Sequence, residues 1–351
     1  MADKENQHFV PQYYFRFFSE NKKSISLLNR ATGKTVATAP IRGQASKSYF
    51  YGDAKVEGVI TEVESSFIAG LRKISSEKDF GCLSENEVLS VLQAVMFQRS
   101  RTLAKRKDGK KQQDQIVKLF AEIAINKLEN ISEEERQEYY KLLDFMSADP
   151  VPFQGLDMAI SIEQANHLLD LKRIVIKNRT KYPFIFSDAP VVMINPFQQR
   201  VDYRGVLGMV TPGLIIIFPL SPRIIIMFID HKAYNLQGES KGALNIKFVK
   251  DVDQLNKLQI LNSSSAVYFG NPEGSTYVYR LWSEVRRYLD DTPKGMIGEA
   301  LLQDGEDTKE VIHIYDRQLP LMPSFSFLKY EKASRDSHLI DRARWDGKKY
   351  Y

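Results

Sequence analysis

Regularly spaced apolar residues predict a helical region in the middle of the chain. The clearest stripe advances by three- and four-residue steps through Val56, Ile60, Val63, Phe67, Leu71 and Ile74. Capping-box pairs, which favour helix starts, occur at Ser84 with Glu87, Ser132 with Glu135, and Ser161 with Gln164. A further stripe runs from Ile116 to Leu128. We therefore expect residues 54–172 to be helical, with the helix that starts at Ser161 ending near Leu171.

After Arg173 the pattern changes to short apolar runs that are rich in β-branched and aromatic residues, which predicts strands. The runs are Ile174–Ile176, Phe184–Phe186, Val191–Ile194, Leu214–Phe218, Ile224–Ile229 and Ala266–Phe269. Because each run is continuously apolar, we expect both faces of these strands to be covered. Closer to the N-terminus, Ser24–Asn29 and Thr35–Thr38 flank a Thr-Gly turn and predict a hairpin.

These patterns together predict an α+β fold. Residues 7–53 should form a small β entry, residues 54–172 a helical region and residues 173–270 a mainly β part, all within one domain of residues 7–270. The stripe through Tyr277–Leu289 predicts a C-terminal helix. The rest of residues 271–351 should form a highly charged tail.

Composition narrows the class of protein further. With 43% hydrophobic and 26% charged residues, the 351-residue chain has ordinary globular usage, which excludes disordered and coiled-coil classes. Its single cysteine, Cys82, excludes an intrachain disulfide and a Cys-rich zinc site. The start is polar, and the most apolar window, Leu214–Ile229, is interrupted by prolines and Arg223. We therefore expect a cytoplasmic protein with no membrane partner. The net charge of +5 is too small to indicate a polyanionic partner by itself.

Four sequence blocks, in order, resemble the bacterial DUF4238 family of unknown function. The blocks are HFVPQYY at 8–14, QxxR at 98–101, SDAPV at 187–191 and FPLSP at 218–222. The spaced residues Asn256, Gln259 and Tyr268 resemble the last block of the family pattern. The similarity covers about Gln7 to Gly270. It implies a bacterial intracellular protein without an established activity, and it singles out the polar residues of these blocks.

Ser187 and Asp188 follow an apolar run and precede Pro190, at the end of a predicted strand where binding sites often lie. The carboxylate is suited to bind a metal or to act as a base, and the hydroxyl is suited to orient a substrate. The alternative is a structural turn whose side chains cap the loop backbone. No G-x-S-x-G motif surrounds Ser187, which argues against that class of hydrolase.

Gln98 and Arg101 stand three residues apart and therefore share one face of a predicted helix. An arginine there is suited to bind a phosphate, and a glutamine to orient a base or water. The alternative is an ion pair inside the fold. Because both blocks belong to the same family pattern, we expect Arg101 to lie within salt-bridge or one-water distance of Asp188.

His8 lies among aromatic residues, where a histidine acts either as a general acid or base near neutral pH or as a hydrogen-bonded packing residue. The other histidines show no metal-ligand spacing: His167, His231, His313 and His338. No metal ligand set is therefore identified, and a divalent metal stays open as a cofactor.

The strongest charge feature is a basic run with a local balance of +6, in which only Asp108 is acidic. Its basic residues are Arg99, Arg101, Lys105, Arg106, Lys107, Lys110 and Lys111. Such a run can neutralise the phosphates of RNA or DNA, and all of its members except Arg101 are then candidate nucleic-acid contacts. The alternative is a solvated helix end that stops at Gly109.

The leading hypothesis is a nucleic-acid-acting, nuclease-like toxin or defence effector with a catalytic group of His8, Gln98, Arg101, Ser187 and Asp188. Asp188 would be the base or a metal ligand beside Ser187, Arg101 and Gln98 would hold a phosphate, and His8 would donate a proton. The alternatives are a non-catalytic nucleic-acid- or protein-binding regulatory module and a small-molecule enzyme. GxxxxGK[ST], GxGxxG and HExxH motifs are absent from the chain. The sequence leaves the reaction and the oligomeric state open.

Overall fold

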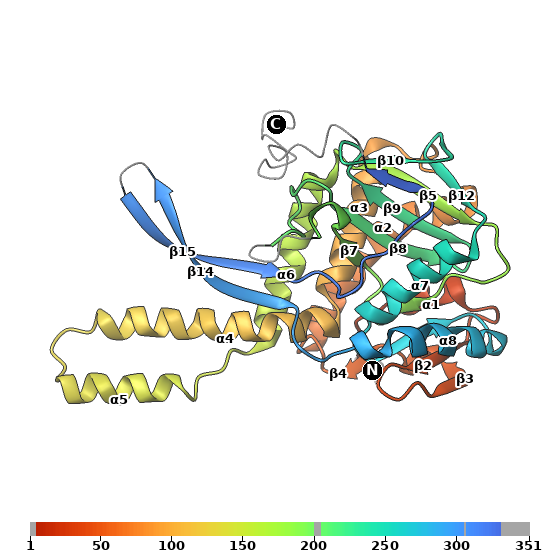
Figure 1. The fold of residues 1–351 in the computed structure, drawn as a ribbon. Helices are drawn as coiled ribbons and strands as arrows, with labels where there is room; N and C mark the ends of the chain where they lie inside the picture. Colours follow the sequence, from red (N-terminus) through yellow and green to blue (C-terminus); the bar gives the residue numbers. More distant parts are fainter. Residues whose placement is uncertain (1–4, 200–204, 305–306, 331–351) are drawn as a thin grey trace.

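A six-stranded sheet organises the computed structural model, which describes residues 5–199, 205–304 and 307–330 (Figure 1). The strand order is β11-β12-β5-β9-β8-β7. The strands are β5 (Lys172–Asn178), β7 (Val192–Ile194), β8 (Ile215–Ser221), β9 (Ile224–Ile229), β11 (Glu239–Ser240) and β12 (Ala243–Ile246). β12 pairs with β5 in parallel, and the other neighbouring strands pair antiparallel.

Alternate residues of the central strands enter two separate cores, because successive side chains of a strand point to opposite faces. Ile216 and Phe218 pack with α1 (Gln12–Phe18), α2 (Ala54–Glu77) and α3 (Glu85–Ser100). Ile215 and Ile217 pack with α7 (Val249–Asn262) and α8 (Ser275–Val285) on the other face. The predicted covering of both faces is confirmed, and it explains why these runs are continuously apolar.

A second, four-stranded sheet joins the N-terminal hairpin to the later strands in the order β3-β2-β13-β6. It consists of β2 (Ser24–Asn29), β3 (Thr35–Pro40), β6 (Phe186–Ser187) and β13 (Ala266–Phe269), so the predicted hairpin is confirmed. Two short strands, β1 (Asn6–His8) and β4 (Ser46–Ser48), pair beside it. This arrangement brings the family blocks around residues 8, 187 and 268 into one part of the body.

Two hairpins project from this body on the same side (Figure 1). α4 (Leu103–Asn126) and α5 (Glu133–Leu143) form a helical hairpin, and we call residues 103–146 the arm. α6 (Pro150–Gln164) returns to the body and packs against α3. The other hairpin is formed by β14 (Gly295–Asp304) and β15 (Asp307–Asp316), and it diverges from the arm after packing on α4. A last pair, β10 (Tyr234–Leu236) with β16 (Leu328–Tyr330), closes the described chain.

The α+β class is confirmed, whereas several local predictions are wrong. Ser161 lies near the end of α6, because Asp149 caps that helix and Pro150 occupies its first turn. Gly109 ends no helix, since α4 continues through it. The β14–β15 hairpin occupies a region where only a helix and a tail were expected. Residues 331–351 of the predicted tail lie outside the described residues. No described helix has the length and apolar character needed to cross a membrane.

Candidate functional site

The guanidinium of Arg101 is enclosed where α3 ends, with the residue only 1% exposed. Its Nε donates to the hydroxyl of Tyr51 at 3.0 Å, and one amino group donates to the backbone carbonyl of His8 at 2.5 Å. The other amino group forms an ion pair with Glu64 of α2. Burial alone would lower the pKa of Arg101, but Tyr51 and Glu64 reverse this effect and raise it. Arg101 is therefore a fixed positive charge at the centre of the site.

Gln98 lies one turn before Arg101 and donates from Nε2 to the backbone carbonyl of Phe9 at 2.9 Å. Gln98 and Arg101 thus bind the carbonyl groups of two consecutive residues, His8 and Phe9. Both side chains lie on one helix face, as the sequence predicts. This face, however, binds the N-terminal segment of the chain itself. Gln98 is 5% exposed and positions that segment.

α2 brings two carboxyl groups to the same place. Asp53 caps the helix by accepting from two backbone N–H groups, and Glu57 and Glu64 follow two turns apart on one face. One carboxyl oxygen of the half-buried Glu57 is buried and accepts no hydrogen bond within the described part of the chain. Burial raises the pKa of Glu57, Arg101 opposes this shift and Glu64 adds to it. Glu57 therefore holds a proton more readily than an exposed glutamate.

The pKa of His8 is shifted in the opposite direction from that of Glu57. Its Nε2 lies 3.1 Å from the backbone carbonyl of Arg42. Because a carbonyl only accepts, we assign the proton to Nε2, which leaves the lone pair on Nδ1. Burial lowers the pKa of His8, the Arg42 hydrogen bond opposes this and Arg101 lowers it further. The imidazole is therefore neutral at pH 7, with Nδ1 able to accept a proton.

We call His8, Tyr51, Glu57, Glu64 and Arg101 the Arg101 cluster. Burial raises the pKa of Tyr51 to about 12, so its hydroxyl stays protonated beside Arg101. A carboxyl group with a raised pKa and a histidine with a lowered pKa, in one cluster, are the groups that acid–base catalysis requires.

One exposed arginine, Arg16, acts on His8 of the Arg101 cluster, and a second, Arg72, acts on the neighbouring Tyr13. The charge of Arg16 lowers the pKa of His8, and Arg72 opposes the rise that burial causes in the pKa of Tyr13. Arg16 and Arg72 are both exposed. These two positive charges are suited to attract an anionic substrate.

Asp188 belongs to a different network. It is 2% exposed, and its carboxylate accepts from the backbone N–H groups of Ser264 at 2.8 Å, Ser265 at 2.7 Å and Ala266 at 3.4 Å. Burial raises the pKa of Asp188, and these three donors oppose the shift. The side chain therefore caps the start of β13, which is the structural alternative considered from the sequence.

Arg101 was expected within salt-bridge or one-water distance of Asp188. The salt bridge is wrong, because Arg101 pairs with Glu64 and the carboxylate of Asp188 accepts from backbone N–H groups. β6 carries Asp188 to the start of β13, whereas the end of α3 faces α2 and the N-terminal segment. Ser187 lies with Asp188: its hydroxyl donates to Gln259 of α7 at 3.1 Å and accepts from an N–H at 3.3 Å. The structure thus joins His8 and Arg101 by a hydrogen bond, whereas Ser187 and Asp188 bind other partners.

The residues of the basic run from Lys105 onward lie on different sides of α4, because the helix continues through Gly109. Arg99 and Lys105 both pair with Asp316 of β15. Burial would raise the pKa of Asp316, but these two cations lower it to about 2.

Further along the run, Arg106 stacks on Phe50 with its guanidinium carbon 3.6 Å from the ring centre. Lys110 pairs with Asp114. Lys107 and Lys111 are exposed and form no ion pair within the described part of the chain. Only these two offer the unengaged charge that a phosphate contact needs.

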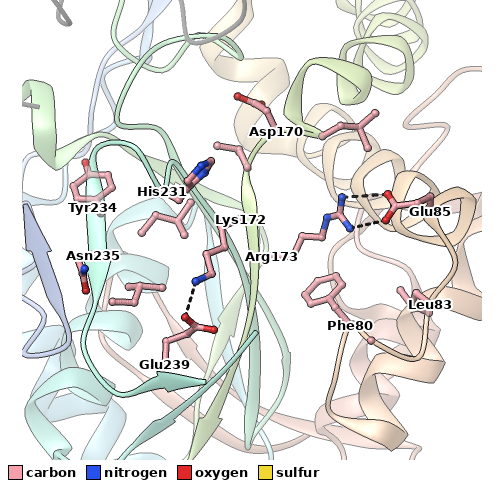
Figure 2. Close-up of a pocket in the computed structure, with 15 residues that line it drawn as sticks. Phe80, Leu83, Glu85, Asp170, Lys172, Arg173, His231, Tyr234, Asn235 and Glu239 are labelled. Carbon is pink, nitrogen blue, oxygen red and sulfur yellow. Dashed lines mark hydrogen bonds and ion pairs between the residues drawn. The ribbon is translucent and has the colours of Figure 1, made fainter. Parts of the chain in front are cut away.

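A cleft of about 820 Å³ lies at one end of the central sheet, near the start of β5 (Figure 2). Arg173 faces Glu85 across 3.3 Å, and Lys172 lies 2.5 Å from Glu239. The cations of this cleft are therefore engaged by its carboxylates. None of the site residues predicted from the sequence lines it.

Sequence reasoning missed Glu57, Glu64 and Tyr51 as members of the site. The available signal is the seven-residue spacing of Glu57 and Glu64, which places both on one face of the first long helix. Among the described residues, no three His, Cys, Asp or Glu side chains are grouped so that they could hold a metal ion. The structure thus names no metal ligands.

Comparison with known proteins gives a family but no activity. No curated protein and no solved structure matches the chain. A family model described as "Protein of unknown function (DUF4238)" matches residues 6–273, which include the Arg101 cluster and the Asp188 network. The chain belongs to this family.

Proposed function

We propose that the protein cleaves RNA by acid–base chemistry at the Arg101 cluster. The proposal rests on the pairing of Glu57 and His8 in one cluster. The pKa of the Glu57 carboxyl is raised, and one of its oxygens is buried without a hydrogen-bond partner in the described chain. The imidazole of His8 is neutral because its pKa is lowered. Opposed pKa shifts of this kind assign an acid and a base. Glu57 is the general acid and His8 the general base, which replaces the proton-donor role expected for His8.

The reaction balances with these two groups. Nδ1 of His8 takes the proton of the ribose 2′-hydroxyl, and the 2′-oxygen forms a bond to phosphorus. The bond from phosphorus to the 5′-oxygen breaks, and that oxygen leaves with the proton of Glu57. The products are a 2′,3′-cyclic phosphate and a 5′-hydroxyl, so the nucleophile comes from the RNA itself and DNA is not cleaved.

The remaining residues support this pair. Arg101 is too buried to contact RNA, so it acts as a positioning residue that holds the backbone of His8 and the carboxylate of Glu64. Exposed Arg16 and Arg72 attract the phosphate backbone. RNA cleavage in a cell would act as a toxin or defence activity, so expression of the wild-type protein should slow growth.

The test is cleavage of a labelled RNA by the purified full chain, with the end groups of the products identified. Glu57→Gln should lower the rate by about 10²–10⁴-fold, because it removes the general acid. Glu62→Gln, which alters an exposed carboxyl on the same helix, is the matched control and should keep the rate. The wild-type rate should fall at low pH as His8 gains a proton and at high pH as Glu57 loses one.

Absence of cleavage by the wild-type protein, or full activity of Glu57→Gln, would overturn the proposal.

The second candidate, a non-catalytic binding module, is favoured by a specific observation. Gln98, Arg101, Ser187 and Asp188 are all buried and hydrogen-bonded to this chain. In that case the Arg101 cluster serves only to hold the N-terminal segment.

A further inference from the structure

Exposed apolar side chains are concentrated on the arm. The described residues include 17 exposed large hydrophobic side chains, and seven of them lie on this short segment. The seven are Phe120, Ile123, Leu128, Tyr139, Leu142, Phe145 and Met146. Phe145 is 85% exposed and Phe120 is 66% exposed. Such a concentration indicates an interaction surface.

The exposed residues follow helical spacing on both helices of the arm. Phe120 and Ile123 stand three apart on α4, and Tyr139 and Leu142 stand three apart on α5. Residues at this spacing share a face, so each helix presents an apolar stripe. In α5 only Leu143 is buried, which shows that contact with α4 covers little of that helix.

Charge is distributed unevenly along the arm. Its base, residues 103–113, has five basic residues against one acidic residue, a net charge of +4. Its tip, residues 120–138, has two basic residues against six acidic residues, a net charge of −4. Lys107 and Lys111 are exposed at the base, and Glu133, Glu134 and Glu138 are exposed at the tip. Base and tip are therefore complementary in charge.

We propose that the arm binds the arm of a second copy of this chain in antiparallel orientation. A two-fold axis near Phe120 sets the acidic tip of each arm against the basic base of the other, and the apolar stripes meet between them. The acidic tip argues against nucleic acid or an anionic membrane as the occupant, because both would be repelled there. The proposal is independent of RNA cleavage, since the arm lies outside the Arg101 cluster.

The first test is sedimentation velocity of the full chain over a concentration series. We expect a monomer–dimer equilibrium that shifts toward monomer as salt is raised, because screening weakens the contact between base and tip. Phe120→Asp combined with Leu142→Asp should give monomer at all concentrations. Phe248→Asp, at a residue 65% exposed outside the arm, is the matched control and should still dimerise. Circular dichroism verifies that each variant is folded.

The second test is mutual rescue by charge reversal. Lys107→Glu with Lys111→Glu makes the two unpaired charges of the base negative and lowers its net charge from +4 to 0. Glu133→Lys with Glu134→Lys and Glu138→Lys changes the net charge of the tip from −4 to +2. Each variant alone should be monomeric, because the attraction between base and tip is lost in the first variant and becomes repulsion in the second. An equimolar mixture should form the heterodimer, in which the unchanged base faces the unchanged tip and the altered base faces the altered tip. In a parallel dimer, base would face base and tip would face tip, so like charges would already meet in the wild type. Changing only the base or only the tip would then not weaken the dimer. A monomeric wild type, a dimer insensitive to the arm variants, or a mixture that stays monomeric would overturn the proposal.

Discussion

The Arg101 cluster and the Asp188 turn each hold a buried ionisable side chain from a family block, but they satisfy it in different ways. Asp188 accepts from three backbone N–H groups, which carry no exchangeable charge. Arg101 is held by Tyr51, Glu64 and one carbonyl, so two of its three partners are ionisable side chains. A charge satisfied by the backbone fixes a turn, whereas a charge beside ionisable side chains acts on their pKa values: Arg101 lowers the pKa of His8 and opposes the rise that burial causes in the pKa values of Glu57 and Tyr51.

The two regions also differ in access. Ser187 and Asp188 are 0% and 2% exposed, which closes the turn to any substrate. In the Arg101 cluster the side chain of Glu64 is 18% exposed, and His8 and Glu57 are half-buried. Burial is sufficient to shift pKa values there, while part of the cluster still reaches the surface.

The largest expected effect is on stability at the centre of the cluster. Arg101→Met should lower the free energy of unfolding by about 3–5 kcal/mol, because it leaves the carboxylate of Glu64 without its counter-charge. Urea unfolding measures the loss, and Arg72→Met, at an exposed arginine, should change the same quantity by less than about 0.5 kcal/mol. A loss below about 1 kcal/mol for Arg101→Met would contradict the role of Arg101 as an anchor.

A smaller effect is expected at the turn. Asp188→Asn replaces an accepting oxygen by an amide NH₂ that faces a backbone N–H, which should cost about 1–3 kcal/mol in urea unfolding. The exposed Asp144→Asn is the control. Because the two networks are separate, the effects of Asp188→Asn and Arg101→Met should add within about 0.5 kcal/mol. Strong coupling between them would restore the shared site expected from the sequence.

The smallest expected effect has the opposite sign and concerns Glu57. Its folded pKa lies above the reference value of 4.5, so wild-type stability is favoured below that pH and falls as pH rises through the folded pKa. Glu57→Gln has no such titration. Relative to wild type, its melting temperature should therefore be higher at pH 7 than at pH 4. An equal difference at both pH values would mean that the Glu57 pKa is unshifted.

Elements with strong local signals could be predicted from the sequence. The capping boxes at Ser84 and Ser132 start α3 and α5, and the run Ile224–Ile229 is a covered strand. Gly109 did not end the helix as predicted, because the glycine is tolerated inside a helix that is capped at Thr102 and packs against α6 and β14. The β14–β15 hairpin was missed because its strands lack a strong alternating apolar pattern.

The site could be predicted only in part. The spacing of Gln98 and Arg101 correctly placed both on one face, and the resemblance drew attention to His8, whose catalytic role stays a prediction. Which carboxylate faces Arg101 depends on how α2 packs against α3, and local sequence does not encode that contact. Asp188 looked equally suited to pair with Arg101 because its true partners are backbone amides, which every residue except proline carries.

The central claim is that the Arg101 cluster is reactive and that the Asp188 turn is structural. The most direct measurement compares initial rates of RNA cleavage by Glu57→Gln and Asp188→Asn, at a temperature where both are folded by circular dichroism. The account predicts a rate loss of about 10²–10⁴-fold for Glu57→Gln and a near wild-type rate for Asp188→Asn. A normal rate for Glu57→Gln with a lost rate for Asp188→Asn would contradict it.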